Sequence, residues 1–175
     1  ETLNGWLEKG CKSLVFQNIQ DRIKHRRLKS LESVYWPEHL KRADKYGLDL
    51  VMYEGGTHVI FPYDEPVDQA LVDLLIEFNY SPQMIDLYKD LFDAWESAGG
   101  ELFNVFSDIY SPGRYGSWGH LRHLDDDNTR WDAVTDQNRN GAVSEIRPEN
   151  AFADGVHSTK LVVLQYYAEP ISTTY

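Results

Sequence analysis

Residues 48–59, LDLVMYEGGTHV, constrain the fold more than any other stretch of this chain. The run from Leu48 to Met52 is nearly all apolar, which is typical of a strand buried on both faces of a parallel sheet. The strand then reaches Glu54, and the two glycines after it let the backbone leave by a route that bulkier residues resist. An unpaired carboxylate is costly to bury, so Glu54 must reach a cleft, a partner or solvent. Active sites of α/β folds lie at the carboxyl ends of strands. A solvated Glu54 at an ordinary turn is an equal alternative.

Helical periodicity accounts for most of the sequence on either side of this strand. The predicted helices cover residues 2–46 with a boundary at Trp36-Pro37, residues 67–78 and residues 82 to about 97. Residues 101–109 are rich in aromatic and branched side chains and predict a second strand. The loop after it, residues 110–119, combines Gly, Pro and Ser with large aromatic residues, a composition typical of functional loops. Alternating helices and strands in this order predict an α/β fold.

The net charge excludes nucleic acid as a partner, and the hydropathy of the chain excludes a membrane. The 175 residues include 28 acidic and 17 basic side chains, for a net charge of -11, whereas nucleic-acid binding requires a basic face. The one dense basic patch, residues 24–29 (KHRRLK), is predicted to be a solvated helix face. No apolar run is long enough to cross a bilayer, so no membrane partner is expected.

Two motifs together resemble a known family. The segment YGLDLVMYEGGTH at 46–58 resembles the seventh strand of a clan A glycoside hydrolase barrel. The segment LYKDLFDAWESAGGELFN at 87–104, followed by GSWG at 116–119, resembles its seventh helix, eighth strand and following loop. The order is especially similar to bacterial secreted proteins described as cellulose-binding or glycosidase-like. The resemblance implies a partial (β/α)8 TIM barrel over residues 1–137 and a C-terminal extension of unknown role over 138–175.

The resemblance also implies a chemistry, retaining hydrolysis of a glycosidic bond. Glu54 matches the catalytic nucleophile, and Trp118 matches an aromatic platform for a sugar ring, with a structural role at the rim as the alternative. Tyr53 and His58 flank Glu54 as orienting or substrate-binding residues, and Asn104 on the second strand is a further substrate-binding candidate. The mechanism requires a second carboxylate as acid/base. The family supplies it from an Asn-Glu pair on the fourth strand, and nothing in this chain corresponds to that pair.

Three functions follow as hypotheses. The first is a fragment of a secreted hydrolase, a glycosidase that acts on a polysaccharide. The second is a carbohydrate-binding or cellulose-binding module without catalysis. The third is a structural fragment whose strand edges self-associate or pair with a missing N-terminal half, since the chain opens with Glu1 within a predicted helix. The expected location is extracellular or periplasmic.

Metal binding is a minor alternative. Asp136, Asn138 and Asn140 match the opening of an EF-hand-like calcium loop. Arg147 occupies the twelfth position, where a bidentate Glu is needed, so a polar turn is favoured and no cofactor is predicted. His120 and His123 lack a third ligand at suitable spacing. Residues 125–128 (DDDN) are predicted to cap a helix.

Overall fold

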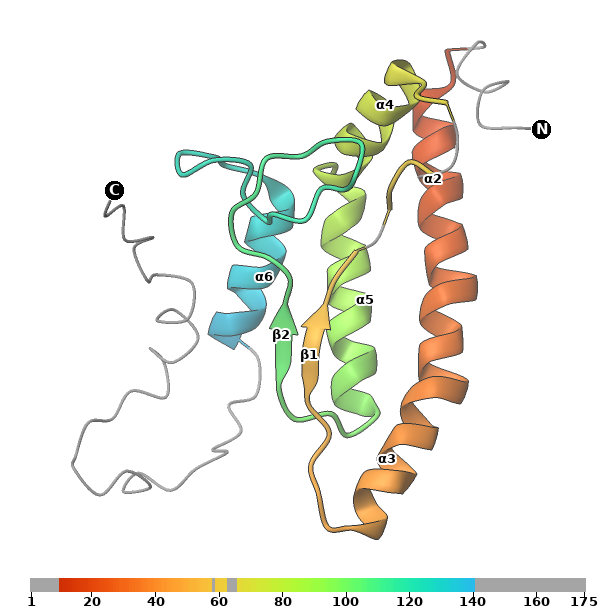
Figure 1. Ribbon diagram of the computed structural model, residues 1–175, viewed down its shortest axis with the longest axis vertical. Coiled ribbons are helices and arrows are strands. Elements are labelled where there is room, and N and C mark those ends of the chain that lie inside the picture. Colours follow the sequence, from red (N-terminus) through yellow and green to blue (C-terminus); the bar gives the residue numbers. More distant parts are fainter. Residues whose placement is uncertain (1–9, 58, 63–65, 141–175) are drawn as a thin grey trace. The chain divides into compact units, whose positions relative to one another are not determined.

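The computed structural model describes residues 10–57, 59–62 and 66–140, and Figure 1 shows how their helices and strands are arranged. A long helix comes first and consists of α2 (Lys12–Arg22), the π-helical stretches η1 (Ile23–Leu28) and η2 (Leu31–Tyr35), and α3 (Trp36–Lys45). The remaining elements are β1 (Met52–Gly55), α4 (Gln69–Asn79), α5 (Gln83–Ser97), β2 (Phe103–Val105) and α6 (Thr129–Asn140).

The long helix passes through the predicted boundary at Trp36-Pro37. Pro37 lies in the first turn of α3, directly after the π-helical stretch η2. Proline has no N–H to donate to the carbonyl of Ser33, four residues earlier, and its ring crowds that carbonyl. A π-helical turn uses i to i+5 hydrogen bonds and has a wider backbone. The backbone thus stays helical across Pro37, while the predicted boundary coincides with the junction at which η2 ends and α3 begins, with Pro37 in the first turn of α3.

The sheet consists of two parallel strands. Met52 pairs with Phe103 and Gly55 with Val105, with an irregularity between these pairs. The N–H of Phe106 donates to the carbonyl of Gly55 at 2.9 Å just beyond the paired strands. Residues 48–51 lie outside the strand, and the side chains of Leu48 (63%) and Val51 (50%) are exposed. The predicted burial of this stretch on both faces is wrong.

The predicted partial (β/α)8 barrel is also wrong. The described residues form a small α/β structure with one two-stranded parallel sheet and no part of a barrel. The two strands are adjacent and parallel because α4 and α5 provide the connection between them, and this order is common to many α/β folds. The local sequence thus predicted the strands but not the sheet they belong to. Residues 141–175, most of the predicted extension, lie outside the described residues.

Helix α5 lies at the centre of the packing and contacts both the sheet and the long helix (Figure 1). The ring of Phe103 on β2 packs edge-on against Phe92 at 5.2 Å and Trp95 at 5.8 Å between ring centroids. Trp95 in turn meets Trp36 of the long helix at 5.3 Å. The predicted helices at 67–78 and 82–97 are confirmed, as is the assignment of their apolar and aromatic residues to the core. Within the described residues, every helix is too short or too polar to span a lipid bilayer.

Phe92 provides a test of this packing, because its ring joins α5 to β2. We expect Phe92→Ala to lower the free energy of unfolding by about 3–5 kcal/mol, the range for losing a buried aromatic ring. Ile85 lies on the same helix and is 40% exposed, so Ile85→Ala is the control, with an expected loss below about 1 kcal/mol. Urea unfolding monitored by circular dichroism measures both values. Equal losses would place Phe92 outside the core.

Candidate functional site

The carboxyl ends of β1 and β2 lie side by side, and both strands continue into irregular segments at that end (Figure 1). The segment after β1 is fixed by Asn79 at the end of α4. The buried Asn79 amide donates to the carbonyl of Val59 at 2.9 Å, and its oxygen accepts from the hydroxyl of Thr57 at 3.1 Å. In α/β folds, ligands bind beyond the carboxyl ends of strands. This end of the sheet is therefore the candidate site.

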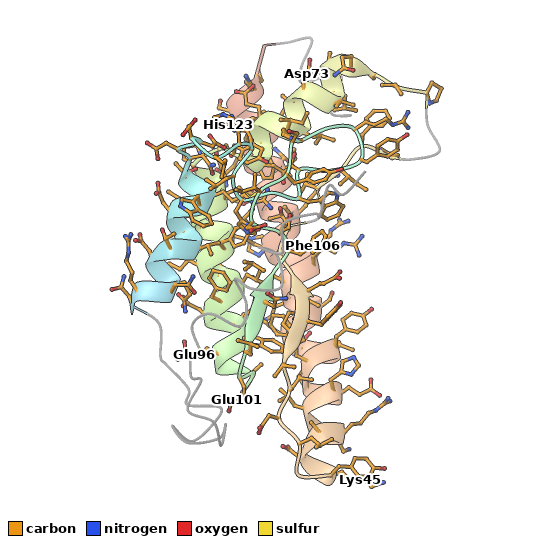
Figure 2. All side chains as sticks on the ribbon, turned by 60° about the vertical axis from the view of Figure 1, so that its left-hand side comes forward. Lys45, Asp73, Glu96, Glu101, Phe106 and His123 are labelled. Atoms are coloured by element: carbon orange, nitrogen blue, oxygen red, sulfur yellow. The ribbon has the colours of Figure 1, made fainter. Side chains whose placement is uncertain are left out.

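The segment after β2 folds back on itself between residues 107 and 121, which we call the post-β2 loop. Ser107 N–H donates to the carbonyl of Trp118 at 2.8 Å, and Leu121 N–H donates to the carbonyl of Asp108 at 2.8 Å. Gly119 makes this closure possible, because a Cβ there would lie 2.2 Å from the backbone nitrogen of Tyr110. Two ends held by backbone hydrogen bonds give the loop a defined shape. Figure 2 labels Phe106, which precedes the loop, and His123, which follows it.

A buried polar network holds the post-β2 loop onto the helices. Arg130 of α6 is fully buried, and its guanidinium donates to the carbonyls of Ser117 at 2.5 Å and Trp118 at 3.1 Å. Its Nε also donates to the hydroxyl oxygen of Tyr88 on α5 at 3.2 Å. Hydrogen bonds from a charged donor are the stronger kind. Arg130 thus joins α5 and α6 to the backbone that carries Trp118.

His120 is the second member of this network and is also fully buried. Its Nδ1 lies 2.5 Å from the carbonyl of Ser107, and its Nε2 lies 2.9 Å from the hydroxyl of Tyr88. A carbonyl can only accept, so Nδ1 carries the proton and Nε2 accepts from the Tyr88 hydroxyl. Burial, together with the positive charge of Arg130, lowers the pKa of His120 from 6.5 to about 4. The imidazole is therefore neutral at physiological pH, as this hydrogen-bond pattern requires.

The network also reaches the end of β1. A Cβ on Gly56 would lie 3.1 Å from the hydroxyl oxygen of Tyr88, and Gly56 has a φ of 140°. Any other residue at this position would be strained in the backbone and would crowd the hydroxyl. Tyr88 thus lies next to Gly56, which directly follows β1, and it bonds to His120, which lies in the post-β2 loop. One side chain of α5 therefore lies close to the segments that follow both strands.

A second ionic cluster lies directly after the post-β2 loop. The guanidinium of Arg122 binds both oxygens of Asp126, at 2.8 and 2.5 Å, and stacks over the ring of Tyr80 at 4.8 Å. The hydrogen bonds from Arg122 hold the pKa of Asp126 well below its usual range. Burial raises the pKa of Tyr80, and its hydroxyl donates to the carbonyl of Gly119 at 2.9 Å. The oxygen of Asn128 accepts from the N–H groups of residues 130 and 131, so the predicted helix cap in 125–128 is confirmed.

The residues predicted from sequence lie around this site without forming one cluster. The amide of Asn104 donates to the carbonyl of Tyr53 at 2.8 Å, so these two are neighbours on β2 and β1. The side chain of Glu54 is exposed and makes no hydrogen bond or ion pair with the described residues. Trp118 is half-buried, packs edge-on against Phe106 at 5.9 Å and donates from its indole to the carbonyl of Tyr115. His58 lies outside the described residues.

The sequence did not predict that Tyr88, His120 and Arg130 form one buried unit. Tyr88 falls on the apolar face of a helix, and Arg130 falls in a polar stretch, so neither pattern indicates burial of a polar network. His120 was weighed with His123 as a metal pair, but only His120 is buried, while His123 is exposed. The available sign in the sequence was a Gly-rich loop followed directly by His120 and, ten residues later, by Arg130.

Metal coordination finds no support in the described residues, among which no group of three or more His, Cys, Asp and Glu side chains is placed to hold an ion. Asp136, Asn138 and Asn140 lie in the last turns of α6, and the rest of the predicted calcium loop lies outside the described residues. Calcium binding there stays a prediction. In comparisons with known proteins, no family model, no curated protein and no solved structure matched the chain.

The neutral state of His120 predicts a pH dependence of stability. Its pKa is lower in the native state, so the unfolded chain binds a proton at this site as the pH falls below 6.5 and the native chain does not. Stability from this group is complete above pH 6.5 and is lost progressively down to about pH 4. The full loss is about 3 kcal/mol. Urea unfolding at several pH values measures it.

The matched variants are His120→Gln and His123→Gln. We expect the fall in unfolding free energy between pH 6.5 and 4 to be smaller in His120→Gln by about 3 kcal/mol and unchanged in His123→Gln. Titration of the imidazole protons by NMR gives an independent measure. A pKa of His120 near 6.5 in the native protein would contradict the assigned tautomer and network.

Proposed function

We propose that this chain binds carbohydrate beyond the carboxyl ends of β1 and β2. The observation that carries the proposal is the set of aromatic side chains on β1 and the post-β2 loop. Tyr53 on β1 is 77% exposed, Tyr110 and Tyr115 of the post-β2 loop are 54% and 59% exposed, and Trp118 of the same loop is half-buried. Exposed aromatic side chains that gather on one surface mark a binding site. The carbohydrate ligand implied by the resemblance of residues 46–58 and 116–119 stays a prediction.

Carbohydrate suits this surface for two physical reasons. Sugar rings have an apolar face of C–H groups that packs against aromatic rings, while tyrosine hydroxyls and the Asn104 amide bind sugar hydroxyls. A neutral glycan also avoids the repulsion that an anionic ligand would meet from a chain with a net charge of -11. The backbone of Trp118 is held by Arg130 and Ser107, so its ring starts from a fixed position. Pre-ordered rings lose less entropy on binding.

Binding is favoured over cleavage because of the surroundings of Glu54. A retaining glycosidase places its two carboxyl groups about 5 Å apart. Glu54 is exposed, and none of the described residues bonds to it or orients it. Catalytic groups are normally held by neighbouring side chains. We therefore assign Glu54 to ligand contact in this chain. The extracellular or periplasmic location stays a prediction.

Tyr53 gives the most direct test of binding, because its ring is exposed and its loss leaves the core intact. We expect Tyr53→Ala and Trp118→Ala to weaken binding of a soluble cellulose derivative by about tenfold or more. Tyr46 is 70% exposed and lies at the end of α3, beyond the amino end of β1, so Tyr46→Ala is the matched control with unchanged affinity. Affinity electrophoresis in polysaccharide-containing gels measures the shift. Equal mobility of all variants would refute the proposal.

Glu54→Gln separates binding from cleavage, since the two side chains have nearly the same shape. We expect the unmodified chain to release no reducing sugar from cellulose derivatives or xylan, and Glu54→Gln to keep its affinity within about twofold. Release of reducing ends by the unmodified chain, abolished in Glu54→Gln, would instead establish Glu54 as a catalytic nucleophile.

A further inference from the structure

The densest group of basic side chains lies on the long helix, far along the chain from the candidate site. Five of the 17 Lys and Arg residues fall between residues 22 and 29, and this segment includes all of the π-helical stretch η1. Rare π-helical turns occur frequently at functional sites. Charge and backbone geometry thus single out the same short segment.

The segment has an inner and an outer side. Ile23 and Leu28 pack into the core, and Lys24 forms an ion pair with Asp90 of α5 at 2.7 Å. Four basic side chains of the segment are exposed, and we call them the basic face: Arg22, Arg26, Arg27 and Lys29. The inner side fixes the orientation of the helix on α5. The basic face is therefore presented to solvent in a fixed orientation.

The basic face is not neutralised within the protein. Lys29 contacts Glu32 at 3.4 Å, while Arg22, Arg26 and Arg27 form no ion pair with any described residue. The chain has 28 acidic residues, yet none of those described pairs with these three arginines. Arg22 and Arg26 are four residues apart, and like charges at this spacing destabilise a helix. An oppositely charged partner would remove this cost.

We propose that the basic face binds a short carboxylate-rich segment of a partner protein. Arginine guanidinium groups bind carboxylates through two parallel hydrogen bonds, and three of the four side chains are arginines. From Arg22 to Lys29 the helix rises about 10 Å, which matches a few residues of peptide. The rest of the chain is strongly acidic, so a long polyphosphate that extends past the patch would lie against acidic surface, whereas a short peptide stays within the patch. Charge and size together select an acidic peptide over nucleic acid.

The test compares two double variants with the same change in net charge. Arg26→Glu with Arg27→Glu alters the basic face, and Lys41→Glu with Arg42→Glu alters exposed positions in α3 of the same helix. The probe is a short fluorescent peptide of alternating Asp and Glu, titrated with the full chain at physiological salt. We expect the first variant to lose affinity by about tenfold or more and the second by less than about threefold. Circular dichroism checks that both variants keep their helix content.

Three outcomes would overturn the proposal. Equal losses in the two variants would show that net charge alone governs binding. No binding of the peptide by the unmodified chain would exclude an acidic peptide as ligand. Tighter binding of a single-stranded oligonucleotide of the same length would assign the basic face to a polyphosphate instead. Carbohydrate binding is measured separately and does not depend on these results.

Discussion

The buried guanidinium of Arg130 is the interaction on which the candidate site depends. Removing a cation from water is costly unless its hydrogen bonds are replaced. Here carbonyl oxygens, the Tyr88 hydroxyl and the faces of two tyrosine rings replace them, the rings of Tyr80 and Tyr88 lying 5.6 and 5.7 Å from the guanidinium carbon. These groups come from the post-β2 loop, from α5 and from Tyr80 at the end of α4. The carbonyl oxygens of the post-β2 loop can accept hydrogen bonds from Arg130 only when the loop is closed, so the buried charge favours the closed conformation.

The positive charge of Arg130 also determines the protonation state of His120. A protonated imidazole at His120 would add a second positive charge next to Arg130 in a site without water contact. It would also reverse the role of Nε2 and oppose the Tyr88 hydroxyl hydrogen. Neutral His120 therefore follows from the position of Arg130. Ser107 accepts from both the backbone and the ring of His120, at 2.9 and 2.5 Å, and uses both lone pairs.

Helices were predicted well from the sequence because their evidence is local. The apolar residues of α4 and α5 recur at helical spacing and pack in the core, as expected. The network could not be predicted in this way, since Tyr88 and Arg130 are 42 residues apart and no local pattern joins them. The barrel failed for a related reason. A strand such as residues 52–55 specifies its own conformation, whereas the number of strands that pair with it depends on the whole chain.

The π-helical stretches have a consequence for how the long helix tolerates change in its length. A π-helical turn holds one more residue than an α-helical turn, so η1 and η2 each take up extra chain without breaking the helix. Trp36, which packs on Trp95, lies beyond both stretches. Loss of one residue within η1 or η2 would convert that π-helical turn into an α-helical turn and leave Trp36 directed at α5. The two stretches are therefore the places where this helix can lose a residue and keep its packing on α5.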